Sequence, residues 1–165
     1  MRAGKRVYLG LGGNQGDRLG NLRRAVKLLR ELPGVEVEAL SAVYETEPQG
    51  YREQPEFLNM AVRIRTTLAP LALLRETAQI EEKLARRRTV KDGPRTIDLD
   101  LLLYEGVEMG SPTLTLPHPR MRERAFVLTP LRDVWAEEGP APSASKSLAG
   151  QGIARFRETL FEEEL

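Results

Sequence analysis

Cysteine is absent from this chain, which excludes disulfide bonds, thiolate nucleophiles and zinc sites built from thiolates. Histidine occurs once, as His118, and aromatic residues make up only 5% of the chain. Long hydrophobic runs are missing as well. The first residues, MRAGKRVYLGLGG, hold too short an apolar stretch for a signal peptide, and no later stretch approaches a membrane span. The sequence therefore predicts a cytoplasmic protein with no membrane partner.

Neither sign of charge is in excess, because 25 lysines and arginines stand against 24 aspartates and glutamates and give a formal net charge of +1. A nonspecific nucleic-acid binder normally carries a clear basic excess, so no nucleic-acid partner is expected. With 165 residues, 41% of them hydrophobic, the chain can bury a core without a disulfide or a structural metal. We therefore predict a single domain spanning residues 1–165.

Hydrophobic periodicity and turn residues predict an alternation of strands and helices. The expected elements are a strand at 7–11, a helix from Asp17 to before Pro33, strands at 35–46 and 57–64, a helix from Pro70 to about Leu84 and a strand at 97–103. This order predicts the α+β class, as a ferredoxin-like βαββαβ antiparallel sheet with both helices on one face and the other face free for a site. Extra C-terminal strands and a short helix from about Leu148 are expected to follow, after a surface loop at 137–147.

The stretch 93–103, GPRTIDLDLLL, carries the strongest chemical signal in the chain. Its apolar residues recur with period two, as in a strand that buries one face. They are Ile97, Leu99, Leu101 and Leu103. Asp98 and Asp100 then share the opposite face, where two like charges repel unless a cation such as Mg²⁺ lies between them. A solvated polar face is the common alternative, but the apolar neighbours make unpaired charges costly there, so we interpret the pair as a metal site.

Two further groups of side chains fit such a site. A cluster of cations lies just upstream of the two aspartates and suits the oxyanions of a metal-bound polyphosphate. It consists of Arg86, Arg87, Arg88, Lys91 and Arg95. In the strand at 57–64, Phe57 and Asn59 face away from the core set, and such an aromatic and amide pair suits a planar heterocycle. A second packing layer for Phe57 and a solvated amide for Asn59 fit the sequence equally well.

Several segments together resemble one family. They are YLGLGGNQGDR, YETEP, PEFLN, the stretch 93–103 and PHPRMRERAFVLTPL. In order and spacing they are similar to the 6-hydroxymethyl-7,8-dihydropterin pyrophosphokinases of folate biosynthesis, from about Val7 to Trp135. The resemblance implies a ferredoxin-like catalytic domain that transfers diphosphate from ATP to the pterin hydroxymethyl group and releases AMP. It also implies that ATP and the pterin are the partners, and we expect a monomer.

The same resemblance assigns roles to matching positions. Asp98 and Asp100 would hold two Mg²⁺ ions, with Arg86, Arg88 and Arg95 completing the catalytic set. The pterin would be bound by Thr46, Phe57, Asn59 and Phe126. ATP would be bound by Glu81, Arg86, Arg88, Arg95, Thr115, His118 and Arg124. Asp92 stands where many members of the family carry a tryptophan, so closure of the loop at 86–92 over the substrates is a hypothesis.

Other interpretations stay open for individual residues and for the whole chain. Taken alone, His118 would be a surface-loop histidine, Thr46 and Thr115 would expose their hydroxyls on strands, and Arg120 and Arg122 are interpreted as a solvated basic face. For the whole chain, the alternative function is a ferredoxin-like module that binds a nucleotide or RNA without chemistry. Only Tyr8 and Phe57 approach the aromatic pattern that RNA binding by this fold needs.

Overall fold

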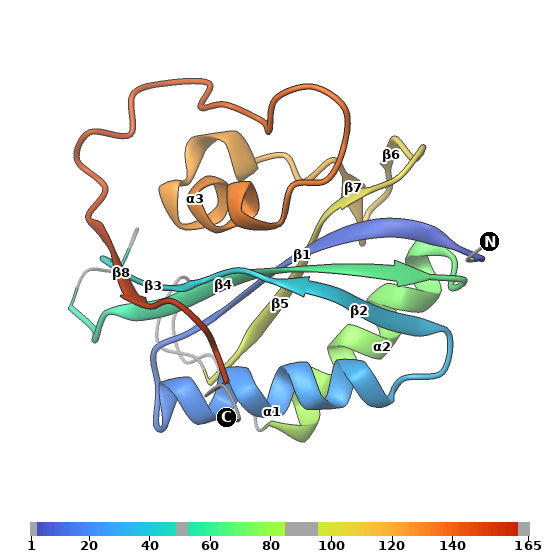
Figure 1. Ribbon diagram of the computed structural model, residues 1–165, viewed down its shortest axis with the longest axis horizontal. Coiled ribbons are helices and arrows are strands. Elements are labelled where there is room, and N and C mark those ends of the chain that lie inside the picture. The colour runs from blue at the N-terminus through green and yellow to red at the C-terminus, as the bar shows by residue number, and fades with distance from the viewer. Residues whose placement is uncertain (1–2, 49–52, 85–95, 162–165) are drawn as a thin grey trace.

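A computed structural model describes residues 3–48, 53–84 and 96–161, which form a twisted antiparallel sheet between two layers of helices (Figure 1). The elements are β1 (Lys5–Gly13), α1 (Arg18–Glu31), β2 (Val35–Leu40), β3 (Val43–Thr46), β4 (Phe57–Thr66), α2 (Pro70–Lys83), β5 (Asp98–Tyr104), β6 (Met109–Gly110), β7 (Thr115–Leu116), the 3₁₀ helix η1 (Met121–Glu123), α3 (Ala125–Val134) and β8 (Ile153–Arg157). Among these helices, none is long and apolar enough to cross a membrane.

The main sheet has the order β5-β1-β4-β3-β8. Strand β2 also pairs with β4, on the same edge as β3 but nearer the C-terminal end of β4. Every pair in it is antiparallel, and the sequence of β1, α1, β2/β3, β4, α2 and β5 is the ferredoxin-like pattern predicted above. The strand predicted at 35–46 is divided into β2 and β3. The division falls at Ser41, whose hydroxyl accepts from the Ala61 amide at 2.8 Å and so replaces a ladder partner.

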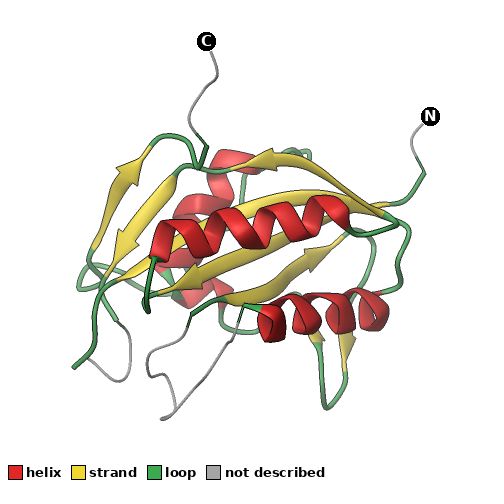
Figure 2. Cartoon of the chain, turned by 90° about the horizontal axis from the view of Figure 1, so that it is seen from below, coloured by secondary structure: helices red, strands yellow, loops and turns green. Residues whose placement is uncertain are grey.

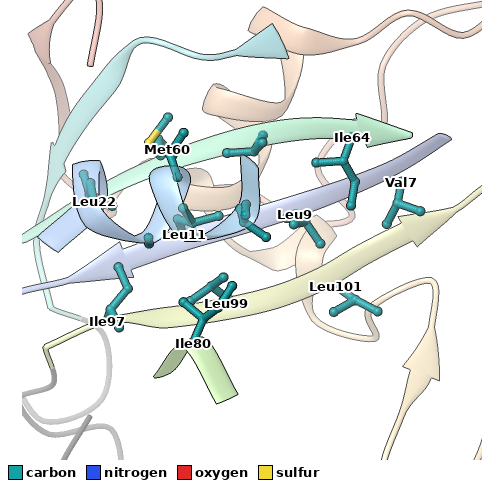
Figure 3. Packing of buried hydrophobic residues seen from close by; sticks show 14 of the residues in the cluster. Val7, Leu9, Leu11, Leu22, Met60, Ile64, Ile80, Ile97, Leu99 and Leu101 are labelled. Carbon is teal, nitrogen blue, oxygen red and sulfur yellow. The ribbon is translucent and has the colours of Figure 1, made fainter. Parts of the chain in front are cut away.

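Helices α1 and α2 cover one face of the sheet (Figure 2). The Asp17 carboxylate caps α1 by accepting from the Gly20 amide at 3.0 Å, and Gly34, at a φ of 80°, allows the tight return into β2. Between helices and sheet lies the main core, which the apolar side chains of β1, β4 and β5 enter at every second position (Figure 3). Its members include Val7, Leu9, Leu11, Leu22, Leu58, Met60, Val62, Ile64, Leu99 and Leu101.

The opposite face of the sheet is partly covered, which corrects the prediction that it is free. Helix α3 packs there on a second apolar cluster (Figure 1), made of Tyr8, Ala61, Leu102, Met121, Val127, Leu131 and Val134. The sequence showed the apolar residues of this segment, but Pro130 inside the helix and the lack of a capping side chain at Arg124 hid its helical character. The short helix predicted from Leu148 is also wrong, since β8 pairs with β3 there as a strand.

A bulge in β5 changes which of its side chains reach the main core. Leu9 of β1 pairs with Leu101, whereas Tyr8 pairs with Leu103, so Leu102 is an extra residue in the ladder. Beyond the bulge, Tyr104 joins the main core and Leu103 packs against the second cluster. The prediction that Leu103 belongs to the main core is therefore wrong, because strict alternation ends at this bulge.

An ion-pair cluster lies on the sheet face that α3 covers, beyond the end of that helix. The carboxylate of Glu38, on β2, accepts from Arg6 at 3.5 Å, Arg63 at 3.2 Å and Arg65 at 3.0 Å, and its side chain is only 6% exposed. Burial alone would raise the pKa of Glu38, but hydrogen bonds from Arg65 and Arg63 outweigh it and lower that pKa below 4.5.

We expect Glu38→Gln to lower the free energy of unfolding by about 2–4 kcal/mol, because it leaves three guanidinium groups around a neutral amide. Glu38 has a lowered pKa when folded, so its contribution is present above its ordinary value of 4.5 and is lost as the pH falls through the lowered pKa. Urea unfolding at pH 7 and below pH 4 measures this, with Glu138→Gln, an exposed carboxylate, as control. An equal loss at both pH values would contradict the expectation.

Candidate active site

A cavity of about 250 Å³ opens on the sheet face beside the first turn of α3. Its floor is formed by the ends of β1, β3, β4 and β5, and its other walls by residues of the 120–127 segment and of the 146–151 segment. The lining residues are Gly10, Leu11, Gly12, Thr46, Glu47, Phe57, Asn59, Met60, Asp98, Asp100, Arg120, Glu123, Arg124, Phe126, Val127, Lys146 and Gln151. Many of the side chains singled out from the sequence thus meet in one place.

Asp98 and Asp100 lie on one face of β5, as the alternation of that strand predicted, and both line the cavity half-buried. Across the ladder they pair with Gly12 and Gly10, which have no side chains to fill the space in front of the carboxylates. Within the described ranges, no group of three or more His, Cys, Asp or Glu side chains could hold a metal. Two half-buried carboxylates that line the same cavity still fit Mg²⁺, which keeps several waters and takes further oxygens from phosphates.

Glu81 supports this strand from α2 and does not line the cavity. Its Oε2 atom accepts from the backbone amide of Leu99 at 2.8 Å. Since Leu99 stands between the two aspartates, this bond fixes the backbone that carries both carboxylates. The structure therefore shows a supporting role for Glu81 on β5, and its contact with the nucleotide stays a prediction.

Asn59 and Thr46 form a buried polar pair at the neighbouring ends of β4 and β3. The Asn59 amide nitrogen donates to the Thr46 hydroxyl at 2.6 Å, and the two residues are 7% and 3% exposed, so neither is the solvated strand residue of the alternative interpretation. Gly12 pairs with Asn59 across β1 and β4. A Cβ atom on Gly12 would lie 2.1 Å from the side-chain oxygen, Oδ1, of Asn59, so only glycine lets the Asn59 side chain take its position.

Two aromatic rings enter the cavity from different layers. Phe57 is buried at the start of β4, and Phe126 is half-buried in the first turn of α3. The Arg124 guanidinium lies 5.3 Å from the centre of the Phe126 ring, a cation–π contact. Aromatic surface, a buried amide and a cation therefore line the same cavity.

His118 and Thr115 lie outside the residues that line the cavity. The His118 amide donates to the Leu102 carbonyl at 2.8 Å, and its Nδ1 atom accepts from the Arg120 amide at 3.2 Å. Burial, with the nearby charges of Arg124 and Arg120, lowers the pKa of His118 to about 4. Without a bound anion, the imidazole is therefore neutral at pH 7. Arg86, Arg88 and Arg95 lie outside the described residues.

Some lining residues were not proposed from the sequence. Arg120, interpreted as a solvated basic residue, is exposed but borders the cavity, and Lys146 and Gln151 come from segments expected to be surface loop and helix. Glu47 and Glu123 complete this group. Glu47 lies in the motif YETEP, and Arg120 and Glu123 lie in PHPRMRERAFVLTPL, but no site role was assigned to them; Lys146 and Gln151 lie outside every motif and periodic element.

Comparison with known proteins gives consistent matches. A family model described as 7,8-dihydro-6-hydroxymethylpterin-pyrophosphokinase (HPPK) matches residues 8–136. The 2-amino-4-hydroxy-6-hydroxymethyldihydropteridine pyrophosphokinase of Bacillus subtilis strain 168 is 49% identical over 145 residues, which cover 87% of this chain and 87% of that protein. The protein of the same name from Aquifex aeolicus strain VF5 is 38% identical over 128 residues, which cover 78% of this chain and 79% of that protein.

Larger proteins match over part of their length. Folic acid synthesis protein fol1 of Schizosaccharomyces pombe is 43% identical over 158 residues, which cover 92% of this chain but 22% of that protein. A crystal structure of Plasmodium falciparum HPPK-DHPS superposes with a TM-score of 0.61 at 13% identity and covers 81% of this chain and 40% of that one. At this identity, the structural likeness shows a shared fold only.

Proposed function

The chain belongs to the 7,8-dihydro-6-hydroxymethylpterin-pyrophosphokinase family, and from this premise we propose how its cavity carries out the reaction. As a pyrophosphokinase of folate biosynthesis, it transfers diphosphate from ATP to 6-hydroxymethyl-7,8-dihydropterin. The pterin hydroxyl oxygen bonds to the β-phosphorus of ATP, the bond from that phosphorus to the α,β-bridging oxygen breaks, and AMP leaves. The hydroxyl proton is released, so the products are AMP and the pterin diphosphate.

The pterin binds in the part of the cavity between β4 and α3. Asn59 and Thr46 are both buried. The side-chain oxygen of Asn59 and the hydroxyl of Thr46 can bond to the amide edge of the ring, since the bond from the Asn59 amide nitrogen to Thr46 leaves each side chain able to form others. Phe57 and Phe126 supply ring surface from the sheet and from the helix. An unpaired buried amide is costly, so this pair favours a ligand with matching donors and acceptors over an apolar one.

Asp98 and Asp100 would hold Mg²⁺, with two ions expected. The chemistry that Mg²⁺ would supply there is neutralisation of charge on the ATP phosphates and a lower pKa of the attacking hydroxyl. The support for this assignment is the half-buried carboxylate pair in front of two glycines, together with the bond from Glu81 that fixes the strand between them. The role of the two aspartates is to hold oxygen ligands in a fixed geometry, and such positioning accounts for much of the rate in phosphoryl transfer.

The triphosphate extends from the aspartates towards the cationic side of the cavity. Arg124 and Arg120 line it and can bond phosphate oxygens. Arg86, Arg88 and Arg95 are proposed to complete this set, and Thr115 and His118 to contact the nucleotide from nearby. Glu81 acts through the Leu99 amide that it holds, as a support for β5.

The alternative of an RNA-binding module without chemistry is disfavoured by Tyr8. Its ring is 2% exposed and stacks on Trp135 with centroids 5.2 Å apart, so it offers no free surface for a base. Phe57 is likewise buried within the cavity. The sheet face therefore lacks the exposed aromatic pair that such a module uses.

We also propose that residues 1–165 act as one catalytic domain, as a monomer in the cytoplasm. The continuous sheet from β5 to β8 supports the single domain.

Nucleotide analysis tests the function. With ATP, Mg²⁺ and 6-hydroxymethyl-7,8-dihydropterin, we expect AMP and the pterin diphosphate to form in equal amounts, and a chelator to stop the reaction. Formation of ADP and phosphate in place of AMP would refute diphosphate transfer, and unchanged activity in the chelator would refute the role of Mg²⁺.

A further inference from the structure

We propose that Gln151 is a positioning residue for the reaction, because its carboxamide fixes the turn that carries Arg124 and Phe126. This inference rests on the proposed function, in which those two side chains bind substrate. It assigns a role to the segment 145–152, the last part of the connection between α3 and β8, which lies on the same side of the sheet as α3 (Figure 1).

The carboxamide of Gln151 bonds to the backbone on both sides of Arg124. Its Oε1 atom accepts from the Ala125 amide at 2.9 Å, and its Nε2 atom donates to the Glu123 carbonyl at 2.9 Å. Ala125 is the first residue of α3, and the capping position, Arg124, makes no side-chain bond to the helix. Gln151 therefore satisfies an amide that the start of a helix leaves without an intrahelical partner.

The next residue anchors the same segment to the opposite wall of the cavity. The Gly152 carbonyl accepts from the Glu47 amide at 3.0 Å, and Ile153 pairs with Thr46 in the β3–β8 ladder. Two consecutive residues thus join the wall that carries Thr46 to the wall that carries Arg124 and Phe126. This connection acts at the first turn of α3, whereas the far end of the helix is bonded to β3 by Asp133, whose carboxylate accepts from the Tyr44 hydroxyl at 2.8 Å.

A carboxamide suits this place for a chemical reason. It presents one donor and one acceptor in a fixed fork, which matches the carbonyl and amide that flank Arg124. Other bonds also attach the segment to the residues before α3: the Ser145 amide donates to the Arg122 carbonyl at 2.9 Å, Arg122 Nε donates to the Ser143 carbonyl at 2.7 Å, and the exposed side chains of Lys146 and Glu123 form an ion pair at 3.3 Å. They attach the segment but do not hold the backbone on both sides of Arg124.

We expect Gln151→Met, which keeps length but removes both bonds, to lower kcat/KM for the pterin about tenfold, since net hydrogen-bond contributions of this size are typical. The loss should appear mainly as a raised KM, because the turn is already loose in the free enzyme and its substrate-binding side chains must be ordered when the pterin binds. Amide hydrogen exchange at residues 123–128 should become faster. Gln151→Ala should behave alike, and Ser147→Ala, an exposed change in the same segment, should match the wild type in both measurements.

Steady-state kinetics and hydrogen exchange together decide the proposal. A raised KM with faster exchange in both Gln151 variants supports it. Faster exchange with unchanged KM and kcat would show that Gln151 holds the turn without positioning substrate, and unchanged exchange would show that it does not hold the turn; either result overturns the inference. A wild-type protein that makes no AMP would instead refute the proposed function, and the exchange data would still report on the turn.

Discussion

Replacing Asp100 with asparagine is expected to abolish nearly all activity, with kcat/KM lower by roughly 10³-fold. Charge stabilisation by a bound metal is worth several kcal/mol, and each 1.36 kcal/mol corresponds to a factor of ten in rate. Asn keeps the size of the side chain and its place opposite Gly10 but removes the charge that holds Mg²⁺. Initial rates of AMP formation measure the effect, and Asp98→Asn should give a loss of the same order.

Thermal unfolding separates this loss from damage to the fold. Without Mg²⁺, Asp100→Asn should still unfold in a single cooperative transition, because asparagine keeps the size of the side chain on this strand face. Added Mg²⁺ should raise the unfolding temperature of the wild type and leave that of the variant unchanged. Glu31→Gln, an exposed carboxylate at the end of α1, is the matched control and should behave as the wild type. A variant that keeps a tenth of the activity, or that still responds to Mg²⁺, would rule out the proposed metal site.

Gly12→Ala is expected to lower kcat/KM for the pterin by about 10²-fold, although it adds a single methyl group. The new Cβ atom would lie 2.1 Å from the side-chain oxygen, Oδ1, of Asn59. The Asn59 side chain must therefore move, which breaks its 2.6 Å bond to Thr46. A buried polar group left without its partner costs about 1–3 kcal/mol, and the displaced amide no longer meets the pterin. Steady-state kinetics with varied pterin should show the loss mainly as a raised KM.

A second substitution identifies the cause of that loss. In an Asn59→Ala background, Gly12→Ala should have little further effect, because the atom with which the methyl group collides is gone; the two effects should therefore not add. Gly110→Ala is the control, since nothing lies within 4 Å of a Cβ atom at that position. Full additivity of the Gly12 and Asn59 changes would mean that Gly12 acts by another route.

Regular alternation made much of the fold predictable from the sequence. Strands β4 and β5 send alternate side chains into the main core over several residues, and the matching pattern of apolar residues predicted that Asp98 and Asp100 share a face and that Asn59 faces away from that core. The division of residues 35–46 at Ser41 was not visible, because a single hydroxyl replaces the ladder there. Leu103 was misplaced because the bulge at Leu102 has no signal in a run of leucines.

The parts of the cavity outside the sheet were harder to predict. Helix α3 contains Pro130 and lacks a side-chain cap of its own, so local rules disfavour it although tertiary packing stabilises it. The bond that satisfies its first amide comes from Gln151, which is 26 residues away. Nothing in the local sequence indicates such a partner, because long-range hydrogen bonds leave no periodic pattern.

Because side chains alternate between the two faces of the sheet along β1, β4 and the start of β5, cavity residues and main-core residues are direct neighbours in the chain. Met60 packs in the main core and directly follows Asn59, and Leu99 packs there between the two aspartates. Shortening the side chain of Met60 or Leu99 would shift the floor of the cavity, because a single peptide unit joins each of them to a cavity residue. Substitutions of exposed cavity residues outside the strands, such as Arg120 and Lys146, therefore change the cavity with less risk to the core than substitutions within the strands.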